Sequence, residues 1–148
     1  MRSFQTQNLE LLQNADYARI KDILYQLISA GFVKAYNNHC LDASKIVMGI
    51  LAQHNIKSDI AECCALLTVN TDTKINHLYA IGFYEDLKRD RIDTHYVVIT
   101  DTIPKILIDA SIFELLLNDQ KIILEEYMDG AIMGNYSYDN FKLTYLQK

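Results

Sequence analysis

Cys40, His95 and Asp109 have the side chains of a nucleophile, a general base and a group that orients the base. Cys40 comes directly before a segment of helical apolar spacing, within NNHCLDASKIVMGIL at residues 37–51. A helix N-terminus carries unpaired N–H groups and a partial positive charge, and both favour a thiolate over a thiol. The position of Cys40 therefore fits a nucleophile, provided that the fold also brings a base to it.

Two β-rich runs can supply that base and its partner. Residues 95–100 and 105–109 flank a turn that holds the only proline, Pro104, which predicts an antiparallel hairpin. His95 begins the first run and Asp109 ends the second, so the hairpin places the two roughly opposite each other. Residues directly opposite have Cβ atoms about 4.5–5.5 Å apart, within reach of a carboxylate–imidazole hydrogen bond.

The remaining elements follow from periodicity and turn residues. The first 35 residues carry helical spacing with an end or kink near Gly31, and a second helix is expected from about residue 40 to 53. Further elements are expected as follows: strands at 60–69 and 75–84, a charged loop at 85–94, a short helix after a Ser111–Glu114 capping box, and a final strand in the 135–147 tail. Helices first and strands later indicate an α+β fold.

The segments NHCLDASKIVMGILAQHNI, THYVVIT and KILIDAS resemble the three sequence blocks of the papain-like transglutaminase-like superfamily, to which the arylamine N-acetyltransferases are similar. The likeness covers about residues 37–111. It implies a single transglutaminase-like domain over residues 1–148, with N-terminal helices packed on an antiparallel sheet. It also implies that Cys40 is the nucleophile, His95 the general base and then acid, and Asp109 the orienting group.

The same resemblance implies an oxyanion hole. One donor would be the backbone N–H of Cys40, and a side-chain amide of Asn37 or Asn38 would be the second. The expected activity is that of a cysteine hydrolase or acyl transferase acting through a thioester. Peptidase, deamidase and transglutaminase types share this chemistry. A protein or peptide is the expected substrate, and no cofactor or metal is required.

Composition excludes several other classes. The net charge of −5 and a pI near 5.2 argue against a nucleic-acid binder, which needs a basic face. No run approaches the roughly 20 apolar residues of a membrane span, and the N-terminus lacks the apolar region of a signal peptide. Cys63 and Cys64 are adjacent and so do not form a disulfide framework. We therefore expect a cytoplasmic protein with free thiols.

Each site residue also has a simpler interpretation. Cys40 can be a small buried hydrophobe, and Asp109 can cap the helix expected after Ser111. His39 and His77 compete with His95, but His39 is adjacent to Cys40 and His77 lies in a strand among apolar neighbours. A zinc site at the three candidate residues lacks any close ligand pair. The main alternative function is a non-catalytic module that retains the fold and binds or inhibits a partner protein.

Overall fold

A computed structural model describes residues 9–35, 39–69, 77–81, 85–86, 91–92, 94–111, 122–138 and 141–148. The helices in these residues are α1 (Leu9–Leu12), α2 (Ala15–Ser29), α3 (Phe32–Ala35) and α4 (Cys40–Gln53). The strands are β1 (Ser58–Val69), β2 (His77–Ile81), β3 (Glu85–Asp86), β4 (Arg91–Ile92), β5 (His95–Thr100), β6 (Ile106–Asp109), β7 (Ile123–Glu126), β8 (Ile132–Tyr138) and β9 (Phe141–Gln147). The predicted α+β class is confirmed.

The helices form where local signals place them. Asn14 caps α2, because its side chain accepts a hydrogen bond of 3.0 Å from the backbone N–H of Tyr17. Gly31 follows α2 with a φ of 74°, a conformation that glycine adopts without strain, so the predicted end near this residue is confirmed. The predicted helix over residues 40–53 is α4, and Ala43, Val47 and Leu51 on one of its faces are buried.

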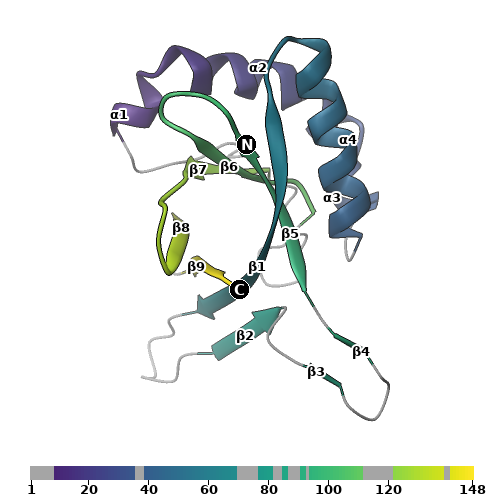
Figure 1. Ribbon diagram of the computed structural model, residues 1–148, viewed down its shortest axis with the longest axis vertical. Helices are drawn as coiled ribbons and strands as arrows, with labels where there is room; N and C mark the ends of the chain where they lie inside the picture. The colour runs from purple at the N-terminus through teal and green to yellow at the C-terminus, as the bar shows by residue number, and fades with distance from the viewer. Residues whose placement is uncertain are drawn as a thin grey trace.

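Antiparallel strands form one large sheet in the order β7-β6-β5-β1-β9-β8. Strand β1 is long enough to have two partners on one edge: residues 58–63 pair with β5 and residues 65–69 pair with β2. Its other edge pairs with β9. Figure 1 shows α1 and α2 across one end of the sheet and α4 alongside β5. The sheet therefore has one face that the helices cover.

The two faces of the sheet bury separate apolar clusters. The helix-facing cluster contains α2 and α4 residues together with Val98, Ile106 and Ile108. The opposite, concave face buries a second cluster, whose members include Cys63, Ala65, Val97, Leu107, Ile123, Met133, Tyr136, Leu143 and Tyr145. The sheet curls toward a barrel around this second cluster: a Cβ added at Gly134 of β8 would lie 3.4 Å from Leu107 Cδ1 of β6.

The hairpin that was expected at residues 95–109 is β5–β6, but its register differs from the prediction. The paired residues are Val98 with Ile108 and Ile99 with Leu107, so Asp109 continues opposite Val97 and not opposite His95. Thr100 closes the turn, because its Oγ1 accepts a 3.0 Å hydrogen bond from the Ile106 N–H. The shift is two residues, so His95 and Asp109 still share a face.

Other expectations need correction or lie outside the described residues. The tail was expected to be one strand, but it forms the hairpin β8–β9, with Asp139 and Asn140, both of turn-forming type, between the strands in sequence. The charged loop contains the paired strands β3 and β4. The helix expected after Ser111 lies outside the described residues. Among the described helices, none combines the length and apolar character that a membrane crossing requires.

Candidate active site

His95 and Asp109 form a buried hydrogen-bonded pair on the concave face of the sheet. His95 Nε2 lies 2.7 Å from Asp109 Oδ2, and the two residues are 4% and 1% exposed. The register makes them diagonal neighbours, since Asp109 follows opposite Val97 and His95 lies two residues before Val97. The predicted contact between the base and its orienting acid is therefore present, but it joins diagonal neighbours and not residues directly opposite each other.

Asp109 receives hydrogen bonds on both carboxylate oxygens. The Tyr145 hydroxyl donates to Oδ2 at 2.7 Å. The backbone N–H and the hydroxyl of Ser111 donate to Oδ1 at 3.1 and 3.2 Å. Burial raises the pKa of Asp109, but the positive charge of His95 and these hydrogen bonds outweigh burial and lower the pKa below its ordinary value. The carboxylate is held charged inside the protein.

Cys40 approaches the pair from the helix layer, as the first residue of α4. Its side chain is half-buried, and Sγ lies 3.9 Å from the carbonyl oxygen of Thr94. The His95 ring and the backbone of Tyr96 both act on the thiol and lower its pKa. Because Nε2 of His95 faces Asp109, Nδ1 is the ring nitrogen left for Cys40. The three predicted residues thus come together in the order thiol, imidazole, carboxylate.

The charges in this arrangement favour a thiolate–imidazolium pair. Burial raises the pKa of Cys40, but the hydrogen bond and charge of His95, with the Tyr96 hydrogen bond, outweigh it and lower the pKa. Burial lowers the pKa of His95, but the charge and hydrogen bond of Asp109, helped by Cys40, raise it well above its ordinary value. A lowered thiol pKa beside a raised imidazole pKa is the arrangement that activates a cysteine nucleophile.

The other candidate residues have different places. Asn37 and Asn38 lie outside the described residues. His39 is the N-cap residue of α4, is exposed and makes no side-chain capping hydrogen bond. His77 begins β2, and its side chain is not among those described. Of the histidines whose side chains the structure describes, His95 is the one that lowers the pKa of Cys40.

Two residues of the site were not predicted for it. Ser111 was expected to cap a helix, and Tyr145 belongs to the tail that was expected to be a strand; both donate to Asp109. Ser111 had a usable signal, since a serine two residues after an aspartate often hydrogen-bonds back to it. Tyr145 had no such signal, because it is 36 residues from Asp109 in the sequence.

Cys63 and Cys64 are buried and form no disulfide, as expected for core residues of a strand. Cys63 pairs with His95 across β1 and β5, and burial raises its pKa well above the ordinary thiol value. In the part of the chain that the structure describes, no group of three or more His, Cys, Asp or Glu side chains has the arrangement of a metal site. The thiol with a lowered pKa is therefore Cys40 and not Cys63.

Comparison with known proteins found no match: no family model, no curated protein and no solved structure is significantly similar to this chain.

Proposed function

We propose that the chain is a cysteine-dependent hydrolase or acyl transferase with a papain-like, transglutaminase-like domain. The observation that carries the proposal is the position of Cys40 at the start of α4, where its Sγ lies 3.9 Å from the oxygen of Thr94, the residue before His95. The Nε2 of His95 is in turn 2.7 Å from Asp109 Oδ2. A nucleophile, a base and an orienting group in this order form the general pattern of covalent catalysis.

The proposed reaction has two halves. The Cys40 thiolate attacks a carbonyl carbon, and the resulting tetrahedral oxyanion collapses as imidazolium His95 gives its proton to the leaving amine, alcohol or thiol. A thioester then links the acyl group to Cys40. Water or an amine attacks this thioester while neutral His95 accepts its proton, and the thiolate leaves as the product departs. Asp109 keeps the His95 ring oriented and stabilises its charged form throughout.

Two further parts of the proposal concern the oxyanion and the substrate. The backbone N–H of Cys40, at the positive end of α4, is one oxyanion donor, and a side-chain amide of Asn37 or Asn38 is the second. A protein or peptide that carries an amide, ester or thioester carbonyl is the proposed substrate. The three free cysteines suit a reducing compartment, so we place the protein in the cytoplasm.

The first experiment measures the pH dependence of Cys40 alkylation by iodoacetamide, located by peptide mass spectrometry. An activated thiol has a pKa of about 3.5–7.5, against about 8.5 for an ordinary one. We expect fast labelling of Cys40 below pH 7 in the native protein. In His95→Ala, labelling at pH 6 should fall at least about tenfold, because the thiolate fraction falls with a rising pKa.

The matched controls are built into the chain. His39→Ala removes the histidine adjacent to Cys40. The His39 side chain is exposed and makes no capping hydrogen bond, so the labelling profile should stay unchanged. Buried Cys63 and Cys64 should stay unlabelled in the folded protein. If labelling of Cys40 rises only near pH 8.5 and ignores His95, the enzyme proposal fails and a search for a protein partner is the next step.

A further inference from the structure

Asp109 accepts two hydrogen bonds on one oxygen. Oδ2 lies 2.7 Å from His95 Nε2 and 2.7 Å from the Tyr145 hydroxyl. Tyr145 is fully buried, and it is contributed by β9, whereas His95 and Asp109 belong to β5 and β6. The last strand of the chain therefore reaches the carboxylate that orients the proposed base.

Strand β1 lies between β9, which carries Tyr145, and β5, which carries His95. Tyr145 pairs with Ala65, and His95 pairs with Cys63, two positions earlier on β1 and on the same concave face. The small side chains of Ala65 and Cys63 leave room above β1 for both rings. These rings stack at an interplanar angle of 21° with centroids 6.3 Å apart. Tyr145 thus contacts both members of the buried pair.

We propose that Tyr145 is a positioning residue, whose hydroxyl keeps the Asp109 carboxylate charged and turned toward His95; this inference rests on the function proposed above. A buried carboxylate has lost its hydration, and protein donors must replace it. Ser111 supplies donors to Oδ1, and Tyr145 supplies the one donor to Oδ2 besides His95 among the described residues. Without the Tyr145 hydroxyl, Asp109 loses a hydrogen bond that holds Oδ2, the oxygen that faces the base, in place.

The electrostatic effect of the hydroxyl has a definite sign. Its O–H dipole points its positive end at Asp109 and offsets part of the negative charge. Other ionisable groups act on Asp109 or Tyr145 from neighbouring elements: His95 of β5, Cys40 of α4, Cys63 of β1 and Glu125 of β7. Removing the dipole makes the site more negative, so Cys40 and His95 both hold their protons to higher pH.

The test is Tyr145→Phe, which keeps the ring and removes the hydroxyl. We expect the acid midpoint of Cys40 alkylation to move upward by about one pH unit, with labelling at pH 6 slowed up to about tenfold. Tyr136→Phe is the matched control, since Tyr136 is buried in the same cluster and is not among the donors to Asp109; it should leave the midpoint in place. Thermal unfolding checks that each variant is folded.

A second variant changes the hydroxyl without deleting it. Replacing Tyr145 by 3-fluorotyrosine makes the hydroxyl a stronger donor, so the midpoint should move downward. If Cys40 is activated in the native protein but its midpoint stays unchanged in both variants, Tyr145 has no positioning role. The proposed function is then unaffected. A native Cys40 that behaves as an ordinary thiol overturns both. A variant with lower stability but an unchanged midpoint shows that Tyr145 only packs.

Discussion

Asp109 and His95 make the stability of the protein depend on pH in opposite directions. The folded pKa of Asp109 is lowered from 3.8, so its contribution to the free energy of unfolding is complete above about pH 4 and is lost as pH falls through the folded pKa. The pKa of His95 is raised from 6.5, so its contribution is complete below pH 6.5 and is lost as pH rises toward the folded value. Both contributions are complete between about pH 4 and 6.5.

Asp109→Asn tests this pair directly. The amide keeps the shape of the side chain but removes the charge that faces His95. We expect the free energy of unfolding to fall by about 3 kcal/mol at pH 6, as is typical when one partner of a buried pair is removed. Urea unfolding at several pH values measures it. The difference from the native protein should narrow below pH 4, and a difference independent of pH would contradict the assignment.

At the scale of elements, the site depends on how α4 meets the edge of β5. Strand β6 pairs with Val98 and Ile99, so among the described residues no strand pairs with the start of β5 on that edge. Side chains of α4 take these positions: Cys40 Sγ approaches the Thr94 oxygen, and the Ser44 hydroxyl donates to the Tyr96 oxygen at 3.3 Å. Because β6 pairs with only a short part of β5, the start of β5 is left accessible to the Cys40 thiol.

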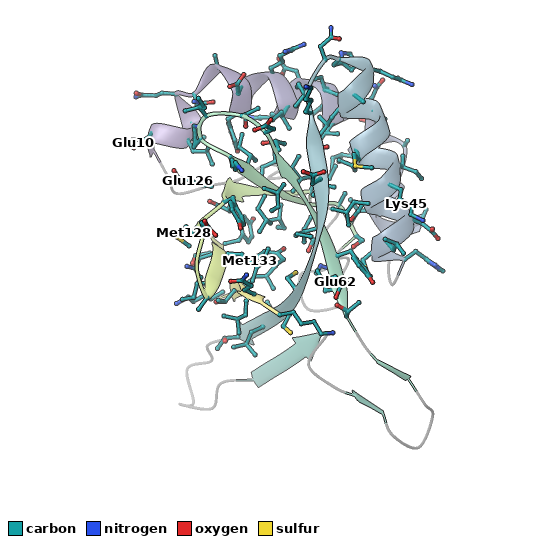
Figure 2. The ribbon with its side chains drawn as sticks, in the orientation of Figure 1. Glu10, Lys45, Glu62, Glu126, Met128 and Met133 are labelled. Atoms are coloured by element: carbon teal, nitrogen blue, oxygen red, sulfur yellow. The ribbon has the colours of Figure 1, made fainter. Side chains whose placement is uncertain are left out.

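Ser44→Ala should loosen this junction. The loss of one partly buried hydrogen bond is expected to lower the free energy of unfolding by about 1 kcal/mol and to slow Cys40 alkylation at pH 6. Lys45→Ala is the matched control on the same helix, because Lys45 is exposed and points away from the sheet (Figure 2). Urea unfolding and the labelling rate are the measurements. Equal effects of the two substitutions would contradict the role of Ser44 as an anchor of α4.

At the scale of the whole molecule, the curvature of the sheet brings the residues of the site close together. The concave cluster joins β6, β8 and β9, and Leu107 of β6 approaches Gly134 of β8 although the two strands are at separate places in the sheet order. Met133 of β8 is buried in the same cluster (Figure 2). Because the sheet closes around these side chains, Tyr145 of β9 comes within hydrogen-bonding distance of Asp109.

Leu107→Ala should weaken this closure. Leu107 is fully buried, so its truncation leaves a cavity and is expected to lower the free energy of unfolding by about 3 kcal/mol. Ile103→Ala is the control in the same hairpin, because Ile103 is 90% exposed; its effect should stay within about 0.5 kcal/mol. Urea unfolding at pH 7 compares the two. A small effect of Leu107→Ala would mean that the concave cluster does not hold the sheet closed.

The sequence by itself determined the features that depend on neighbouring residues. Apolar spacing and a polar start placed α4 at its observed bounds, and a β-rich pair around Pro104 placed the hairpin that carries His95 and Asp109. These signals are local, because helix periodicity and hairpin turns act over fewer than about 20 residues. Local signals selected Cys40 and the His95–Asp109 hairpin separately, and the resemblance in block order joined them into one set.

Only the tertiary structure decided the contacts between distant segments. The register of β5 and β6 is shifted by two residues from the predicted one, which makes the His95–Asp109 contact diagonal. The tail forms two strands, and β9 lies beside β1, which brings Tyr145 to Asp109. The periodicity of a sequence does not predict such pairings, because they join strands that are far apart along the chain.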